Sequence, residues 1–162
     1  MFHNSELDLQ YIKINNLIKN TKESFEPDDE LQSHLAKYLC ILCSGFLENA
    51  LKITLYDFAE KRTDDDMINS FIKSQLARIN NPNSKKIRET TKIFSSDFEE
   101  NLNSFMQEND KSSAINYIIK DRHKIAHGKD SDITIRKIEN YFKKFVEVFV
   151  YIEQDLLKNA SA

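Results

Sequence analysis

The segment RHKIAHG, residues 122–128, holds an arginine and two histidines at a spacing that could do chemistry. A histidine exchanges protons near neutral pH because an unperturbed imidazole has a pKa of about 6.5. An arginine stays charged and offers a planar fork of N–H donors to an anion. Four residues separate Arg122 from His127, and His123 follows Arg122 directly. The segment therefore indicates a site for anion binding and proton transfer.

Arg122 lies on the apolar side of its predicted helix. Apolar residues recur there at i, i+3, i+4 and i+7, which marks a buried helix face. At about 100° per residue, Arg122 falls in the middle of this stripe, and His123 and His127 lie along one edge of it. A guanidinium in that position must be paired, or must face an interface or a cleft, because an unpaired buried charge is costly. The stripe consists of Ile115, Ile118, Ile119, Ile125 and Ala126.

The composition indicates one soluble domain over residues 1–162. The chain is 40% hydrophobic and 30% charged, which suits a domain with its own core and is too polar for a membrane protein. Two glycines and two prolines leave few turn-forming residues, so we expect long helices and an all-α fold. No basic leader precedes an apolar segment, and no run approaches the roughly 18 apolar residues of a membrane span. We expect a cytoplasmic protein.

The helices follow from apolar periodicity and capping residues. We expect the first to be capped by Ser5 and the last to start at Ser131 or Asp132, while Gly128 ends the helix that carries RHKIAHG. Gly45 costs about 1 kcal/mol against alanine inside a helix, so we expect it to permit a close helix contact. Met67, Phe71 and Ile93 are expected to anchor shorter helices. The expected segments are residues 5–25, 30–62, 64–79, 87–94, 96–106, 113–127 and 132–156.

The charge pattern limits the classes of partner. A formal net charge of −3 argues against a protein that coats nucleic acid nonspecifically, but it permits a local basic site. Residues 85–88, KKIR, form one basic patch. The other lies within residues 120–129, where Lys120, Lys124 and Lys129 join Arg122 and outnumber Asp121. Either patch alone usually means a solvated helical face.

Neither a metal nor a cofactor is expected. Cys40 and Cys43 form a CxxC motif, but their apolar helical surroundings indicate buried reduced thiols. His123 and His127 are spaced to share a metal ion, yet no HExxH glutamate or obvious third ligand accompanies them. For Arg122 and His127 a purely structural alternative also exists, in which the arginine forms an ion pair and the histidine interacts with the last helix carbonyls.

The sequence resembles a HEPN domain, a superfamily of helical domains in which an RxxxxH motif is typical. Arg122, His123 and His127 fill the motif, with Ala126 and Gly128 completing its AHG ending. Two further segments, LCSGFLENALK at residues 42–52 and FIKSQLARINNPNSKKI at residues 71–87, resemble the subgroup called RiboL-PSP-HEPN or MAE_28990-like. The resemblance spans residues 31–145 and implies an all-α bundle of about six or seven helices, with long second and last helices.

The resemblance implies a metal-independent endoribonuclease, often the toxin of a toxin–antitoxin or phage-defence system. His127 would move a proton from the ribose 2′-OH or to the leaving 5′ oxygen, and Arg122 would hold the scissile phosphate. The products would be a 2′,3′-cyclic phosphate and a 5′-OH, so RNA and not DNA would be cleaved. His123 replaces the commoner asparagine, which leaves its role open. Lys120, Lys124 and Lys129 are the expected RNA-binding residues, and Glu48 is a possible supporting partner of Arg122. The aromatic series Tyr141, Phe142, Phe145 and Phe149, at helical spacing, is expected to be core and not a base-stacking platform.

The resemblance also implies a homodimer, because one histidine cannot easily act as base and acid on opposite sides of a phosphorus. Two-fold pairing would bring a second Arg122 and His127 into one composite site. An antitoxin protein is a possible further partner. The main alternative is a noncatalytic HEPN domain that binds nucleotide, RNA or protein, and a third is a structural helical adaptor.

Overall fold

The chain forms an all-α domain, as predicted. The computed structural model describes residues 1–27 and 29–160, with side chains up to Leu156. Seven α-helices and one 3-10 turn make up this described part, and the second and last helices are the longest. The elements are α1 (Ser5–Ser24), α2 (Glu30–Glu60), α3 (Asp66–Ala77), α4 (Ser84–Phe94), α5 (Ser96–Gln107), η1 (Glu108–Asp110), α6 (Lys111–Ala126) and α7 (Ile135–Ala160).

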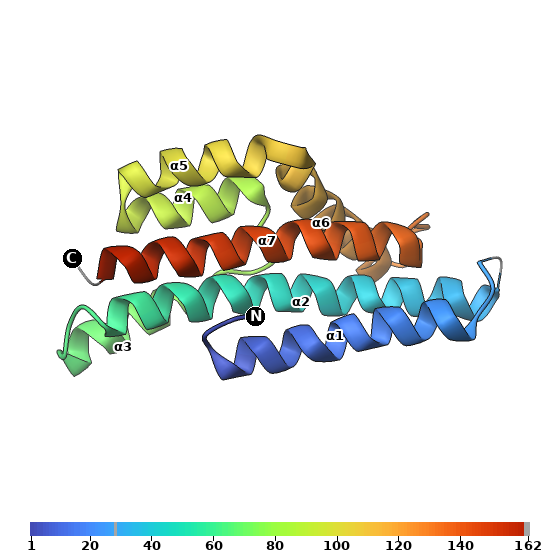
Figure 1. Ribbon diagram of the computed structural model, residues 1–162, viewed down its shortest axis with the longest axis horizontal. Coiled ribbons are helices and arrows are strands. Elements are labelled where there is room, and N and C mark those ends of the chain that lie inside the picture. Colours follow the sequence, from blue (N-terminus) through green and yellow to red (C-terminus); the bar gives the residue numbers. More distant parts are fainter. Residues whose placement is uncertain (28, 161–162) are drawn as a thin grey trace.

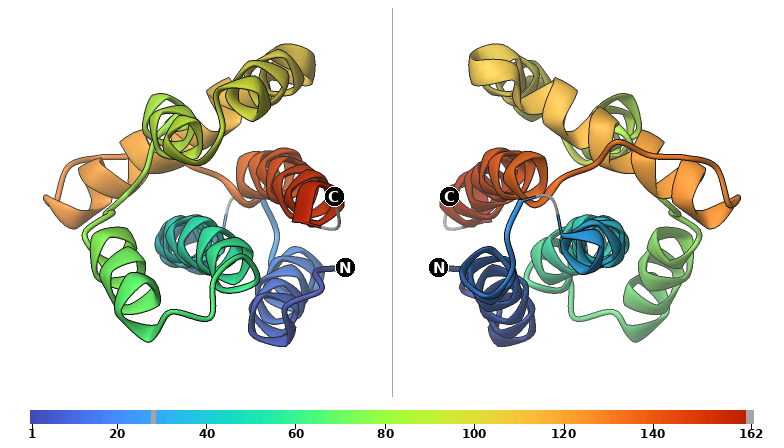
Figure 2. Two further views of the ribbon diagram at one scale, coloured as in Figure 1. Left: turned by 90° about the vertical axis from the view of Figure 1, so that its left-hand side faces the viewer. Right: turned by 90° about the vertical axis from the view of Figure 1, so that its right-hand side faces the viewer.

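Three long helices set the shape of the domain. Helices α1, α2 and α7 run side by side along its long axis (Figure 1). Helix α6 crosses this axis and packs on both α2 and α7, while α4 and α5 form an antiparallel pair beside them. Figure 2 shows the C-terminal end of α6, drawn in orange, at the outer edge of the molecule. Because α6 crosses the long axis, its C-terminal end lies away from the core.

Aromatic packing between α2 and α7 forms the centre of the core. The ring centroids of Phe46 and Phe142 lie 5.7 Å apart, and those of Phe142 and Phe145 lie 5.2 Å apart in an edge-to-face arrangement. These three side chains are buried. Each buried phenylalanine stabilises the fold by about 1.5–3 kcal/mol relative to an exposed one. The long shared interface of α2 and α7 is thus what the other helices pack against.

Helix α2 is apolar enough to resemble a membrane span. Within the described residues it is the one helix whose length and composition would suffice, with a mean hydropathy of 1.3 over its most apolar 18 residues. The sequence analysis expected no such segment. Inside the domain, 56% of that stretch is buried, so burial among the other helices accounts for its apolar character. A core helix of this kind is weak evidence for membrane insertion.

Most helix ends lie within a few residues of their predicted positions, but the capping residues differ at both ends of the chain. Asn4 caps α1, with its side chain accepting from the backbone N–H groups of Glu6 and Leu7, where Ser5 was expected. The last helix starts at Ile135, three residues later than Asp132. Ile133 and Ile135 are both buried, and the chain before Ile135 is not helical. This non-helical segment places Ile133 in the core.

Three expected anchors of short helices are wrong, and Gly45 has no close neighbour. Met67 and Phe71 on α3 are exposed by 78% and 63%, and Ile93 on α4 by 84%. Helix α3 packs mainly on α2, so only one side of it is covered. A Cβ added at Gly45 would meet no atom within 4 Å outside its own helix backbone. The expectation of a close helix contact at Gly45 is therefore wrong within this chain.

Candidate active site

The end of α6 is fixed by a specific hydrogen-bonding pattern around His127 and Gly128. The Gly128 N–H donates to the Ile125 carbonyl at 3.1 Å, and the Lys129 N–H donates to the Lys124 carbonyl at 2.9 Å. With Gly128 at φ +64, this is the Schellman arrangement, which favours glycine because other residues resist a positive φ. The prediction that Gly128 ends the helix is confirmed. His127 is consequently held as the last residue before the chain turns away.

Arg122 lies half-buried in the middle of the α6 stripe, and the part of the chain that the structure describes supplies no partner for its charge. Within residues 1–27 and 29–160, no hydrogen bond or ion pair holds its guanidinium. It lies close enough to Cys40 of α2 to lower the pKa of that thiol electrostatically. The alternative in which Arg122 forms a structural ion pair is therefore absent from the described chain. The arrangement leaves its N–H donors available to an anion.

His123 and His127 lie one helical turn apart on the exposed side of α6. Their ring centroids are 4.4 Å apart with an interplanar angle of 62°, and both residues are exposed. Two imidazoles in contact at a solvent-facing helix end can exchange protons with a bound molecule. Among the described residues, no group of three or more His, Cys, Asp or Glu side chains is close enough to hold a metal ion.

The burial of the stripe decreases toward the motif. Ile115 and Ile118 are fully buried, Ile119 and Ile125 are half-buried, and Ala126 is exposed. Toward the last turn of α6, Ala126 and part of Ile119 and Ile125 therefore remain exposed as apolar surface. The histidines lie on the outer side of the same turn, so the motif and this apolar surface are adjacent.

Glu48 is not a partner of Arg122 in this structure. Its Oε1 accepts from Lys52 Nζ at 2.7 Å, and its Oε2 accepts from the backbone N–H of Asn81 at 2.8 Å. Asn81 has φ +45, a strained value that the contact with Glu48 stabilises. Ser44 Oγ also donates to the Asn81 side-chain oxygen, at 3.3 Å. Glu48 therefore anchors the loop between α3 and α4 to α2.

This loop also lies beside the motif helix. The Ser84 N–H donates to Asn116 Oδ1 on α6 at 3.0 Å. Asn116 precedes His123 by two helical turns on the same side of α6. The loop around residues 80–84 is thus held by α2 and α6 together, about 10 Å along the helix axis from His123.

The three predicted RNA-binding lysines differ in their surroundings. Lys120 and Lys129 are exposed, while Lys124 is half-buried and lies 3.7 Å from Asp121. Sequence reasoning missed Tyr117, and it interpreted Tyr141, at helical spacing with Phe142, Phe145 and Phe149, as a core residue and not as part of a base-stacking surface. Tyr117 on α6 and Tyr141 on α7 stack with centroids 5.5 Å apart, next to Lys120 and Lys124. Spacing along α6 could have related Tyr117 to the lysines, but only the packing of α7 adds Tyr141.

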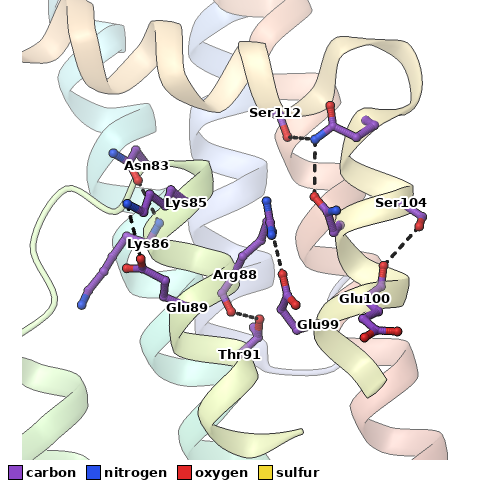
Figure 3. Close-up of polar contacts among 12 residues, drawn as sticks. Asn83, Lys85, Lys86, Arg88, Glu89, Thr91, Glu99, Glu100, Ser104 and Ser112 are labelled. Atoms are coloured by element: carbon purple, nitrogen blue, oxygen red, sulfur yellow. Dashed lines mark hydrogen bonds and ion pairs between the residues drawn. The ribbon is translucent and has the colours of Figure 1, made fainter. Parts of the chain in front are cut away.

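The second basic patch, residues 85–88, has a structural role. Arg88 Nε donates to Glu99 Oε1 on α5 at 2.7 Å, and Lys85 lies 3.7 Å from Glu89 (Figure 3). Thr91 Oγ1 donates to the Arg88 carbonyl in the same view. The side chain of Glu99 is nearly buried, so Arg88 neutralises a charge that would otherwise be costly there. Within this patch it is Arg88 that links α4 to α5, whereas Lys85 pairs within α4 itself.

The two cysteines are buried and reduced, as predicted. Burial raises the pKa of the Cys40 thiol to about 12, with a further contribution from the Asp121 carboxylate. Burial likewise raises the pKa of Cys43 well above its ordinary value. Cys40 Sγ donates to the Ile118 carbonyl at 3.6 Å, which ties α2 to α6 directly beneath the motif. Neither thiol is poised to react, because the thiolate is the reactive form.

The motif in the last turn of α6, within an all-α bundle of this order, agrees with one known family. The sequence profile of the RiboL-PSP-HEPN family matches residues 7–158. The chain belongs to the RiboL-PSP-HEPN family. The match is longer at both ends than the resemblance over residues 31–145, and it includes most of α1 and α7. Comparison with curated proteins and with solved structures gives no significant match.

Family membership indicates the general class of function to which the site belongs. HEPN domains are commonly ribonucleases, and the family assignment implies possible RNA binding. In this HEPN domain the RxxxxH residues lie at one exposed helix end, with the lysines on the same helix. The site is therefore open to a large substrate and is not an enclosed small-molecule cavity.

Proposed function

We propose that this HEPN domain is a metal-independent endoribonuclease that leaves 2′,3′-cyclic phosphate and 5′-OH ends. The observation that carries the proposal is the Arg122 guanidinium, half-buried and without a partner in the described chain, on the same helix end as His127. Partial burial of an unpaired charge is unfavourable, and a phosphate from outside the chain would relieve it. Family membership supports RNA as the source of that phosphate.

The reaction uses the substrate's own 2′-OH as nucleophile. An imidazole accepts the 2′ proton while the 2′ oxygen forms a bond to phosphorus and the bond from phosphorus to the 5′ oxygen breaks. A proton from a second acid neutralises the leaving 5′ oxygen. Arg122 stabilises the charge that develops on the nonbridging oxygens. Because DNA lacks the 2′-OH, it is not a substrate in this scheme.

We propose that the second acid comes from a second copy of the chain. Base and acid must stand on opposite sides of the phosphorus, and His123 and His127 lie together on one side of a single helix. The partly exposed apolar surface near the end of α6, at Ile119, Ile125 and Ala126, supports contact with a partner at this point. A two-fold axis near α6 would give one composite site with two copies of Arg122 and His127.

We further propose that the protein acts in the cytoplasm as a toxin, with an antitoxin protein as its natural partner. The family assignment supports this role without fixing the antitoxin or how it acts. Expression of the protein alone should arrest growth, and His127→Ala or Arg122→Ala should relieve the arrest.

The decisive experiment is end-group analysis of RNA treated with pure protein in the presence of EDTA. Wild type should leave cyclic phosphate ends, while His127→Ala and Arg122→Ala should each reduce cleavage at least about 100-fold. His34→Ala is a matched control, since His34 is an exposed histidine on α2 outside the motif. RNA left intact by the wild-type dimer, or cleavage abolished by EDTA, would contradict the proposal. RNA bound but never cleaved would support a noncatalytic binding domain instead.

A further inference from the structure

A partly exposed aromatic pair lies on the motif helix, on the side of α6 that faces α7. The rings of Tyr117 and Tyr141 are stacked nearly parallel, with centroids 5.5 Å apart and an interplanar angle of 16°. Tyr117 remains 48% exposed, although it stands on a helix that is buried on its opposite face. A tyrosine that served packing alone would gain more from being covered. The pair therefore offers an open aromatic surface.

Basic side chains surround this surface. Tyr117 and Tyr141 line an open cleft of roughly 150 Å³ together with Lys120, Lys124 and Lys137. Two carboxylates, Asp121 and Asp132, also line the cleft. Asp121 accepts from Ser131 Oγ at 3.1 Å and lies 3.7 Å from Lys124, so its charge is partly satisfied. Lys120 has no hydrogen bond or ion pair within the described residues, and its charge faces solvent.

The aromatic surface and the motif lie along one line on α6. Tyr117, Lys120, Lys124 and His127 follow one another at intervals of three, four and three residues, which places them on one helical face. At about 1.5 Å per residue, Tyr117 lies about 15 Å from His127 along the helix axis. A stacked strand covers that distance in about four nucleotides at about 3.4 Å each, and an extended strand in fewer.

We infer that the Tyr117–Tyr141 pair is a subsite that stacks an unpaired nucleobase of the RNA, a few nucleotides from the scissile phosphate, with Lys120 and Lys124 on the intervening backbone. Aromatic rings beside basic groups are what single-stranded nucleic acids require, because every base has a face that can stack. A base within a duplex has no free face, so the preferred substrate is a single strand or a loop. The distance from the stacked base to the scissile phosphate rests on the proposed function. The binding of the base does not.

The test measures binding in the His127→Ala background, so that cleavage does not interfere. The probe is a fluorescently labelled 12-nucleotide single-stranded RNA, compared with the same strand in a duplex. Tyr117→Ala should weaken single-strand binding about 5- to 150-fold, the range for loss of one stacked base, while Tyr117→Phe should bind like the parent. Phe71→Ala is a matched control, since Phe71 is an even more exposed aromatic residue, on α3, and it should leave binding unchanged.

A scan with single abasic nucleotides identifies the stacked position. One abasic site should weaken binding to the parent protein and have no effect on Tyr117→Ala, because the base and the ring act as a pair. Thermal unfolding of each variant separates loss of the ring from loss of the fold. The inference would be overturned if Tyr117→Ala bound the single strand as tightly as the parent, or if the duplex bound as tightly as the single strand. It would also be overturned if, in competition, an acidic peptide displaced the labelled RNA and unlabelled single-stranded RNA did not.

The two proposals fail in different ways. If wild type never cleaves RNA but Tyr117→Ala loses single-strand binding, the endoribonuclease proposal fails and the stacking subsite stands. If wild type leaves cyclic phosphate ends and Tyr117→Ala binds and cleaves as wild type does, the subsite fails and the endoribonuclease proposal stands.

Discussion

Two arginines of this chain, Arg88 and Arg122, are similarly half-buried on neighbouring helices and have opposite surroundings. Arg88 on α4 donates to the nearly buried Glu99 at 2.7 Å and joins α4 to α5 (Figure 3). Arg122 on α6 has neither a hydrogen bond nor an ion pair for its guanidinium within the described residues. The first charge is satisfied by the fold, and the second is left for a molecule from outside.

The contrast shows that local sequence does not reveal which basic residue is functional. Arg88 lies in KKIR and Arg122 in RHKIAHG, and both segments are basic patches on amphipathic helices. The two arginines differ because Arg88 faces an acidic residue on another helix, Glu99 of α5. A charge whose partner is supplied by the fold contributes stability, whereas an unpartnered charge beside titratable groups is typical of a functional site.

The largest expected effect is on catalysis. Arg122→Ala should lower RNA cleavage at least about 100-fold, because the variant loses its donor to the phosphate, while Arg88→Ala should leave the cleavage rate within a factor of two at a temperature where it is folded. Single-turnover rates on a labelled RNA measure both. A large loss of cleavage in folded Arg88→Ala, with Arg122→Ala unaffected, would reverse the roles assigned to the two residues.

The second expected effect is on stability and runs in the opposite direction. Arg88→Ala should lower the free energy of unfolding by about 2 kcal/mol, because Glu99 then keeps a nearly buried charge without its partner. Arg122→Ala should leave this free energy unchanged or raise it. Urea unfolding followed by circular dichroism gives both values. The double variant Arg88→Met/Glu99→Leu should recover most of the loss, and a failure to recover it would show that Arg88 stabilises the fold in another way.

The two glycines of the chain differ in a similar way, because only Gly128 has a backbone conformation that favours glycine. Gly128→Ala should cost about 1 kcal/mol of stability, since φ +64 is unfavourable for any side chain with a Cβ. It should also lower cleavage several-fold, because the end of α6 that holds His127 loosens. Gly128→Asn is the matched control and should keep more of both properties, as asparagine tolerates this conformation. Unchanged cleavage in a destabilised Gly128→Ala would mean that the helix end need not be fixed.

The smallest expected effect is a gain. Gly45→Ala should raise the free energy of unfolding by about 0.4–1 kcal/mol, because a Cβ there meets no neighbour and alanine restricts the unfolded chain. Thermal unfolding at low protein concentration measures the monomer. If Gly45→Ala instead weakens self-association in light scattering, a second copy packs closely against α2, and the glycine serves that contact.

Much of the fold could be predicted because helices depend on local periodicity and on end signals. The end of α6 at Gly128 is readable from a few adjacent residues, and the structure confirms it. The exposed positions of Met67, Phe71 and Ile93 could not be read in this way. Each has the type and spacing of a core residue, but whether a helix face is covered depends on helices distant in sequence.

The RxxxxH motif shows the same division within the site. The sequence by itself determined the helical class, the order of the long helices and the presence of Arg122, His123 and His127 in one helical turn and a half, because these follow from residue types at fixed spacing along one chain segment. Only the tertiary structure decided that Glu48 bonds to Asn81 and not to Arg122, and that Tyr141 stacks on Tyr117. It also decided that no described residue pairs with Arg122. Pairings of this kind join residues from different helices, and packing geometry, which no local pattern encodes, selects them.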